Sequence, residues 1–245
     1  MEKIRCGNFI VKQAETETEY KQLYKLRYFD LLLHYNHDLK KDIEEDKDEY
    51  DEYCDHLIVI DLENNEVIAS YRLIKKNHLN KLHKFLTETE FDISLLKKYE
   101  LLELGRAVVK EEYRNGGAII ALWKGVIRYI VDEKIEYLIG TASFPGTDYH
   151  LYSDTLTYLY DNYLANEDIR CKVNDYSSIK MNLLQEYNER EAKAKISPLI
   201  KGYLNLGSKV GDGAFIDMNF NSIDVLMILK VSEINERYVK RFLGV

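Results

Sequence analysis

The feature that most constrains this chain is a strand that passes through a glycine pair directly into a long apolar helix, ELGRAVVKEEYRNGGAIIALWKGVIRYIVDEK, residues 103–134. Gly116 and Gly117 lack Cβ atoms, so a ligand can come close to the backbone there. The first N–H groups of the following helix have no intrahelical partner, and the helix dipole makes that end partly positive. With Arg114 as an added cation, this turn is predicted to bind a phosphate group. The alternative is a glycine-loosened turn between a strand and a core helix.

The other segments alternate between helical and extended patterns. Residues 16–34 have apolar side chains at helical spacing, and two apolar runs flank Glu63–Glu66 as in a β-hairpin. Further predicted elements are strands at 101–109, 137–144 and 225–231 and helices at 118–134, 149–165 and the C-terminus. A loop is expected where one proline and several glycines follow Lys195, namely Pro198, Gly202, Gly207, Gly211 and Gly213. This order predicts an α/β fold with a mixed, mostly antiparallel central sheet flanked by helices.

Length and composition predict one domain. The chain has 245 residues, only two prolines and no Gly/Ser-rich linker. We expect a single domain over residues 1–245, with a core at about 16–165 and a C-terminal extension at about 166–245. The glycine turn lacks GxGxxG and follows a hairpin, which does not match a dinucleotide-binding fold.

Charge and cysteine content exclude several classes of protein. The net charge of −8 does not favour a general nucleic-acid binder. The longest apolar stretch, Ala118–Val131, includes Lys124 and Arg128 and is too short to span a bilayer. With no signal peptide, the expected location is the cytoplasm, with at most a peripheral contact at the inner membrane. Three scattered cysteines and no CxxC or HExxH argue against disulfides and a metal site.

One segment is strongly acidic. Nine acids and one base, Lys47, lie between Asp42 and Asp55. Such a block predicts either a solvated loop or a binding site for a cationic substrate.

Several segments of the chain, taken in order, resemble a known group of enzymes. A hairpin, a strand and then YRNGGAIIALW resemble the GNAT acyltransferases. The ordered segments KLRYFD, DEYD, SYRLI and ELGR are similar to the acyl-homoserine-lactone synthases. The tail SPLIKGYLNLGSKVGDGAFIDMNFNSIDVLMIL, with YCDHLIV and ASF before it, resembles the ornithine-lipid N-acyltransferases, sometimes labelled hemolysin-like. The resemblance covers about residues 20–245.

The resemblance implies a GNAT-like fold and an N-acyltransferase. The enzyme would move a (3-hydroxy)acyl chain from acyl carrier protein to the α-amine of L-ornithine, the first step of ornithine lipid synthesis. No bound cofactor is expected, because the donor itself carries phosphopantetheine, on acyl carrier protein or on coenzyme A. The alternatives are another amine acceptor, such as another amino acid or a homoserine-lactone-type signal precursor, and a non-catalytic acyl-carrier or lipid-binding protein.

N-acylation needs a base for the amine, and two residues compete for that role. By resemblance, Glu103 lies beside the phosphate turn and would face the donor carbonyl. Its alternative is an ion pair with Arg106, which requires a bulge because the two would otherwise lie on opposite strand faces. His56 is the rival base, and Cys54, on the same strand face, would make a thiol–imidazole pair with it.

The resemblance also implies binding residues. The acyl-donor phosphopantetheine would be bound by the turn that follows the strand, namely Arg114, Asn115, Gly116, Gly117 and Ala118. The expected substrate-binding residues are Arg27, Asp48, Asp51, Arg72, Arg106 and Ser143. The arginines would either hold the substrate carboxylate or neutralise the acids, and the acids would bind an ammonium group or line a solvated loop. An acidic acyl carrier protein would dock on a basic face at Lys124 and Arg128 or at Lys195, Lys201 and Lys209.

Overall fold

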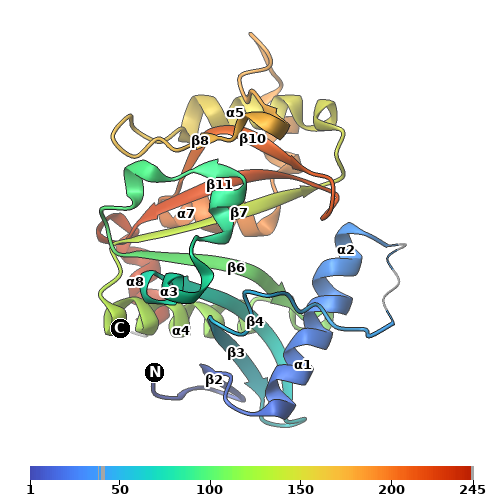
Figure 1. The fold of residues 1–245 in the computed structure, drawn as a ribbon, viewed down its shortest axis with the longest axis vertical. Coiled ribbons are helices and arrows are strands. Elements are labelled where there is room, and N and C mark those ends of the chain that lie inside the picture. Colours follow the sequence, from blue (N-terminus) through green and yellow to red (C-terminus); the bar gives the residue numbers. More distant parts are fainter. Residues whose placement is uncertain (38, 40–41, 244–245) are drawn as a thin grey trace. The chain divides into compact units, whose positions relative to one another are not determined.

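The chain divides into two compact units in the computed structural model (Figure 1), which describes residues 1–37, 39 and 42–243. The first unit consists of Met1–His83, Leu102–Ile135 and Glu236–Val245. The second consists of Lys84–Leu101 and Glu136–Asn235. That the chain forms one domain stays a prediction, and each unit is described separately below.

The first unit is built on an antiparallel sheet. Its strands follow the order β1-β2-β3-β4-β6. Their bounds are β1 Ile4–Cys6, β2 Phe9–Gln13, β3 Asp55–Asp61, β4 Glu66–Lys75 and β6 Leu101–Val109. The hairpin predicted around residues 63–66 and the strand predicted at 101–109 are confirmed. The β1–β2 hairpin was not predicted.

Helices α1 (Glu17–Arg27) and α4 (Gly117–Glu133) cover opposite faces of this sheet. Leu57 of β3 lies against Gly125 of α4, whereas the next residue, Ile58, is buried in a cluster with Leu23 of α1. Successive strand residues point to opposite faces, so the two helices sandwich the sheet. The remaining helices of this unit are the π-helical turn Tyr28–Leu32, α2 Leu33–Tyr35, α3 Leu79–Leu82 and α8 Glu236–Leu243, with 3-10 turns at Lys76–His78 and Glu111–Tyr113.

The start of α1 is fixed by a capping box. Thr16 Oγ1 accepts from the N–H of Glu19 at 3.2 Å, and Glu19 Oε2 accepts from the N–H of Thr16 at 3.1 Å. These two bonds satisfy N–H groups that a helix start leaves unpaired. The predicted helix at 16–34 is confirmed, with a π-helical turn inside it.

A β-bulge interrupts β6 beside β4. Ser70 of β4 pairs with Val108, and Arg72 pairs with Gly105, so three steps on β6 match two on β4. Arg106 absorbs the extra residue with φ +50°, in the left-handed region. The bulge changes the face to which the Arg106 side chain points.

The second unit has a sheet in the order β7-β11-β10-β8-β5, with β9 also paired to β10. The bounds of its strands are β7 Tyr137–Pro145, β11 Ser222–Lys230, β10 Lys209–Asp217, β8 Lys172–Val173, β5 Phe91–Asp92 and β9 Ser178–Ile179. The β8–β10 pair is parallel and the other pairs are antiparallel. The sheet is therefore mixed and mostly antiparallel, and the predicted fold class is confirmed.

The helices of the second unit are α5 Ser153–Tyr163, α6 Glu189–Lys195 and α7 Pro198–Leu206, with 3-10 turns at Leu86–Thr89, Ser94–Leu96, Tyr149–Tyr152, Asp175–Ser177 and Val231–Glu233. The prediction of a loop after Lys195 is wrong, because this segment forms α7 and β10. Gly213 sits inside β10 with φ +95°, and a Cβ there would lie 2.3 Å from Val173 Cγ1. In the described part of the chain, no helix is long and apolar enough to cross a membrane.

Candidate active site

Six charged side chains from separate parts of the first unit come together on one face of its sheet. We call them the arginine–aspartate cluster: Arg27, Arg72, Arg106, Asp46, Asp48 and Asp51. The face is the one that α1 covers. Arg72 is paired with His56 of β3, whose ring packs edge-on against Tyr20 and Tyr24 of α1.

Arg27 and Asp51 form the buried centre of the cluster. Nη1 and Nη2 of Arg27 donate to the two carboxylate oxygens of Asp51 at 2.8 and 3.1 Å. Nε of Arg27 donates to Asp46 Oδ2 at 3.1 Å. Burial opposes the Arg27 charge, but Asp46 and Asp51 outweigh it and hold the pKa of Arg27 above its ordinary value. Every nitrogen of this guanidinium has a carboxylate partner.

Arg72 and Arg106 hold the outer part of the cluster. Nη1 of Arg72 lies 2.7 Å from both oxygens of Asp48 and 3.3 Å from Asp51 Oδ1. Arg106 lies 3.1 Å from Asp46 through Nε and donates to Asp48 through Nη2 at 3.1 Å. Burial opposes ionisation of Asp48, but Arg72 and Arg106 outweigh it, so the pKa of Asp48 lies below its usual range.

These contacts bear on the two interpretations of the acidic block. Asp51 accepts from Arg27 and Arg72 and also from the N–H of Asp48 at 2.8 Å. A carboxylate has about four acceptor sites, and these donors fill them. For Asp46 and Asp51, which are 4% and 3% exposed, the expectation of a solvated loop is wrong. Their contacts fit neutralisation of the arginines better than capture of an ammonium group.

Arg106 joins this cluster because of the bulge in β6. In a regular strand Arg106 would lie on the face opposite Glu103. The left-handed φ of Arg106 turns its side chain toward Asp46 and Asp48 instead. The bulge that the sequence analysis required for Glu103 and Arg106 to share a face is therefore present in β6.

Glu103 lies beside the cluster on the same face. It is paired with Ile74 of β4 and is 2% exposed. Ile74 is two residues after Arg72, so Glu103 and Arg72 share one face of the sheet. Burial raises the pKa of Tyr50, and the charge of Glu103 raises this pKa further. The Tyr50 ring lies 5.5 Å from Arg72 Cζ. A buried carboxylate on this face is a candidate to take a proton from a bound amine.

His56 is held in its neutral form. Its Nε2 lies 3.1 Å from the carbonyl oxygen of Asp51, which can only accept, so Nε2 carries the proton. Nδ1 then holds the lone pair and has no hydrogen-bond partner among the described residues. Burial lowers the pKa of His56 to about 4, although Asp51 acts in the opposite direction. Such an imidazole is a weak base at neutral pH.

Cys54 lies close to His56 but is not activated by it. Its Sγ is 3.5 Å from Nε2 of His56. Burial raises the pKa of the Cys54 thiol, and the nearby arginines do not offset this. The thiolate is the reactive form of cysteine, so this environment disfavours an acyl-cysteine intermediate.

The glycine turn forms the start of α4 as predicted. Gly116 is the N-cap residue with φ +100°, which side-chain-bearing residues rarely adopt. The N–H of Gly117 donates to Asn115 Oδ1 at 3.2 Å, and a Cβ at Gly117 would lie 3.4 Å from Phe9. The backbone from Gly116 to Ala118 therefore begins a helix of 17 residues, whose first N–H groups have no intrahelical partner.

Arg114 is tied to the protein around this turn. Its Nε donates to the carbonyl of Val109 at 2.9 Å, and its Nη2 donates to the carbonyl of Asp30 at 3.1 Å. The side chain remains 45% exposed. These bonds hold the end of β6 against the segment after α1, where Nη2 also lies 3.5 Å from Asp30 Oδ1.

Ser143 belongs to the second unit. It lies on β7, where it pairs with Asp224 of β11, and is half-buried. Its role in substrate binding stays a prediction.

Among the residues that the structure describes, two groups of side chains have ligand atoms close enough for a metal ion. One is Asp51, Cys54 and His56, and the other is Glu90, Asp217 and Asp224 of the second unit. The first lies against Arg27 and Arg72, whose charges repel a cation. Glu90, Asp217 and Asp224 are acidic groups that lie close together, and closeness alone does not assign a metal site.

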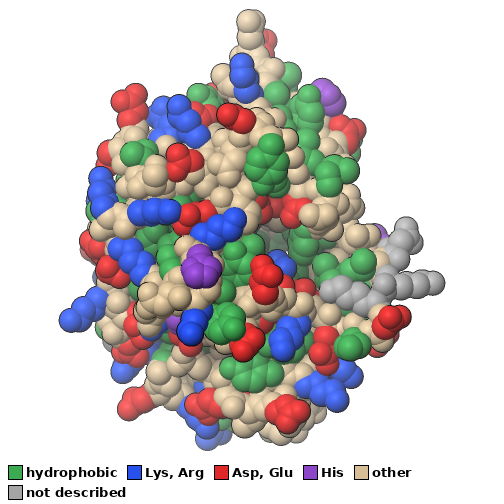
Figure 2. Space-filling view, in the orientation of Figure 1, with side chains coloured by type: hydrophobic (Ala, Val, Ile, Leu, Met, Phe, Trp, Pro, Cys, Tyr) green, Lys and Arg blue, Asp and Glu red, His purple; other side chains and the backbone are tan. Residues whose placement is uncertain are grey.

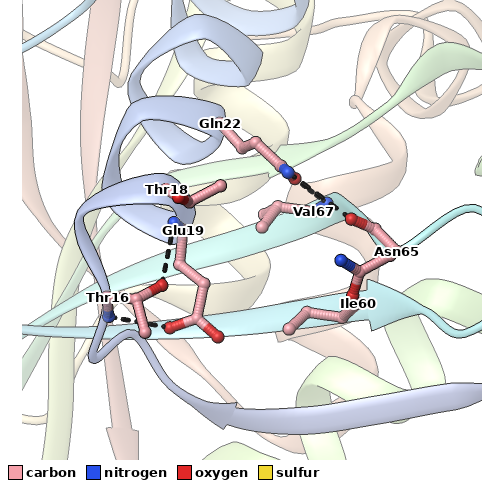
Figure 3. A pocket seen from close by; sticks show the side chains of 7 residues that line it. All are labelled: Thr16, Thr18, Glu19, Gln22, Ile60, Asn65 and Val67. Carbon is pink, nitrogen blue, oxygen red and sulfur yellow. Dashed lines mark hydrogen bonds between the residues drawn. The ribbon is translucent and has the colours of Figure 1, made fainter.

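A cavity of about 240 Å³ lies at the start of α1 (Figure 3). Gln22 donates to the Asn65 carbonyl at 3.4 Å and accepts from the N–H of Val67 at 2.7 Å. Glu19 turns back to the N–H of Thr16. These polar groups serve the helix cap and the hairpin turn, and no site residue predicted from the sequence lines this cavity.

The sequence of this chain is similar to that of known acyltransferases. Residues 26–124 match the family model described as acetyltransferase (GNAT) domain. The chain is 34% identical over 198 residues to the L-ornithine N(alpha)-acyltransferase of Rhodobacter capsulatus, covering 78% of this chain and 76% of that protein. It is also 34% identical over 208 residues to the Brucella abortus protein of the same name, covering 80% and 74%.

Solved structures with the same fold extend over nearly the whole chain. The AHL synthase LasI aligns with a TM-score of 0.52 at 12% identity, covering 96% of this chain and 95% of that one. FeeM, an N-acyl amino acid synthase from uncultured soil microbes, aligns with a TM-score of 0.53 at 9% identity, covering 92% and 93%. At these identities the likeness establishes the fold alone.

The glycine turn at a helix start, the antiparallel strands before it and the GNAT family match define an enzyme of the GNAT acyltransferase class. More narrowly, identity to curated relatives over most of both chains shows that the chain belongs to the L-ornithine N(alpha)-acyltransferase family.

Proposed function

We propose that this enzyme transfers a (3-hydroxy)acyl chain from the phosphopantetheine thioester of acyl carrier protein to the α-amine of L-ornithine. The product is an N-acyl amino acid, the first intermediate of an ornithine lipid. The observation that carries the proposal is Glu103, a buried carboxylate on β6, the strand that leads into the glycine turn at the start of α4. The names of the curated relatives support ornithine as the acceptor.

The chemical step needs one proton acceptor and no bound cofactor. Glu103 takes a proton from the α-ammonium group, directly or through a water molecule. The free amine attacks the thioester carbonyl, a C–N bond forms, and the resulting oxyanion collapses with cleavage of the C–S bond. The thiolate of phosphopantetheine leaves and takes up the second amine proton, and Glu103 releases the first proton to solvent. His56 is less suitable, because its Nε2 is bonded to the Asp51 carbonyl and its ring packs against Tyr20 and Tyr24 of α1.

The glycine turn would hold the donor. The N–H groups of Gly116 and Ala118 and the positive end of α4 suit the phosphate of phosphopantetheine. Arg114, half-exposed beside the turn, adds a cation.

Replacing Gly117 by valine tests this donor site. The added side chain would press on Phe9, whose Cε2 lies 3.4 Å from the Cβ position, and would crowd the N–H groups of the turn. We expect the KM for the acyl donor to rise by about tenfold or more, as for the loss of a charge-assisted hydrogen bond, with a much smaller change in the KM for ornithine. An unchanged donor KM in a folded variant would show that the glycine serves the turn alone.

Acyl carrier protein would dock by local charge. Both proteins are acidic, so their net charges repel at long range. In Figure 2 basic and acidic side chains are interspersed over the face in view. On α4, Lys124 is half-buried, and Arg128 is exposed and bonded to Asp132 at 3.1 Å. The tail lysines Lys195, Lys201 and Lys209 are the other expected docking residues.

Salt dependence tests the docking prediction. Charge steering between exposed groups is screened over about 8–10 Å at physiological ionic strength. Added salt should therefore raise the KM for acyl carrier protein while changing the KM for ornithine little. Replacing Lys124 and Arg128 together by glutamate should raise the donor KM and flatten this response. A double variant that keeps the full salt response would place the docking surface elsewhere.

The acceptor is identified directly by product analysis. Purified protein is incubated with 3-hydroxyacyl chains on acyl carrier protein and an equimolar pool of amino acids that includes ornithine and homoserine lactone. Mass spectrometry should find acyl-ornithine as the main product. Preferential acylation of another amine would move the assignment to that acceptor, and the absence of any product would favour a non-catalytic lipid-binding protein.

A further inference from the structure

Two buried arginines of the cluster differ in how fully they are bonded. Both side chains are 0% exposed. Every nitrogen of Arg27 has a carboxylate partner. In Arg72 only Nη1 has partners, and Nε and Nη2 have none among the described residues. Buried donors are almost always bonded, so an open pair on a fully buried arginine indicates a missing partner.

The two open nitrogens form one edge of the guanidinium plane. Nε and Nη2 point their N–H groups in the same direction, at the spacing of the two oxygens of a carboxylate. Nη1, on the far side, is held by Asp48 and Asp51. The Tyr50 ring lies 5.5 Å from Cζ. Arg72 is therefore fixed on one side and available on the other.

The residue opposite Arg72 on β6 is Gly105, which leaves room there. A Cβ added at Gly105 would have a single neighbour within 4 Å, Nε of Arg72 at 3.8 Å. Glu103 precedes Gly105 by two residues on the same face. The open edge of Arg72, the backbone of Gly105 and the side chain of Glu103 thus share one face of the sheet.

We infer that the Nε–Nη2 edge of Arg72 binds the α-carboxylate of the acceptor and thereby selects its α-amine over its side-chain amine. This inference rests on the proposed function and deepens it, since it assigns a carboxylate-bearing amine as the substrate class. Once the carboxylate is bound by Arg72, the α-nitrogen is one carbon away from it, on the sheet face that also carries Glu103. The δ-nitrogen of ornithine lies three carbons further along the chain and does not reach the same position.

Ornithine and ornithinamide together test this assignment, because the amide keeps both amines and lacks the carboxylate charge. The kcat/KM for each is measured in the wild type and in Arg72→Lys, whose single ammonium group can still pair with Asp48 but offers no fork. We expect kcat/KM for ornithine to fall by about 10- to 100-fold and that for ornithinamide to change little. Fragmentation of the product should also show Nδ-acyl-ornithine appearing in the variant.

Arg27→Lys is the matched control, since Arg27 is equally buried and fully bonded. It should lower kcat/KM for both acceptors by the same factor, together with thermal stability. If Arg72→Lys does the same, the open edge has no substrate role and binds a water molecule only. If wild-type enzyme does not acylate ornithine at all, the proposed function fails, which is a separate result.

A second pair of variants tests the same site without altering the ion pairs. Gly105→Ala and Gly105→Val fill the space opposite Arg72, and the backbone of Gly105 is not in the left-handed region. The KM for ornithine should rise with the size of the added side chain, while the KM for the acyl donor stays constant. A folded Gly105→Val with an unchanged ornithine KM would overturn the inference.

Discussion

Glu103→Gln should lower turnover by about 10²–10⁴-fold while the protein remains folded, the range expected for the loss of a general base. Glutamine has almost the same shape as glutamate, so the packing of this buried residue on β6 is preserved. The amide cannot take the proton of the attacking amine. The loss should appear in kcat with acyl carrier protein and ornithine both saturating, and donor KM should change little because the glycine turn is intact.

Two further measurements make this result specific. Raising the pH should restore part of the activity of Glu103→Gln relative to wild type, since higher pH supplies free amine that no longer needs Glu103 as a base. His56→Ala should retain more of the wild-type turnover than Glu103→Gln, because the His56 ring is packed against Tyr20 and Tyr24 and bonded to the Asp51 carbonyl. Near-normal activity of Glu103→Gln together with an inactive His56→Ala would transfer the role of base to His56.

Asp51→Asn should destabilise the protein by about 3–5 kcal/mol, the cost of leaving a buried charge without its partner. Asp51 is bonded to both terminal nitrogens of Arg27 and lies 3.3 Å from Nη1 of Arg72. Both side chains of the Arg27–Asp51 pair are 0% exposed, so water cannot replace the lost carboxylate. Urea unfolding followed by circular dichroism measures the change in the free energy of unfolding.

The matched control is Asp132→Asn on α4. This change removes the same charge from an ion pair with Arg128, but those side chains are 32% and 48% exposed. Exposed pairs at this helical spacing contribute about 0.5 kcal/mol or less. A loss below about 1 kcal/mol in Asp51→Asn, similar to that in Asp132→Asn, would contradict a structural role for the buried cluster.

The elements that were predicted correctly have a strong local signal. β6 and α4 show their pattern within a dozen residues, and the Glu63–Glu66 turn separates two apolar runs. The sequence predicts a loop at β10 because Gly211 and Gly213 interrupt its pattern. In the structure Gly211 lies against the Cys171 carbonyl and Leu226, at about 3.1 Å from an added Cβ, so these glycines are required by packing.

The cluster shows what spacing in a sequence cannot reveal. Asp46 and Asp51 looked like part of a solvated acidic block, yet both are buried because Arg27 and Arg72 reach them from other elements. Three arginines and three aspartates balance one another there. Asp46, Tyr50 and Gly105 were not singled out from the sequence, since their partners Arg27, Arg72 and Arg106 come from α1, β4 and β6.

The central claim is the transfer of an acyl chain to the α-nitrogen of ornithine with acyl carrier protein as the donor. The most direct measurement uses L-ornithine labelled with ¹⁵N at the α-position and the same 3-hydroxyacyl chain on acyl carrier protein or on coenzyme A, in parallel reactions. Mass spectrometry reads the isotope in the amide, and initial rates give kcat/KM for each donor. We predict ¹⁵N in the amide and a higher kcat/KM for acyl carrier protein. Unlabelled nitrogen in the amide, or a preference for the coenzyme A thioester, would contradict the account.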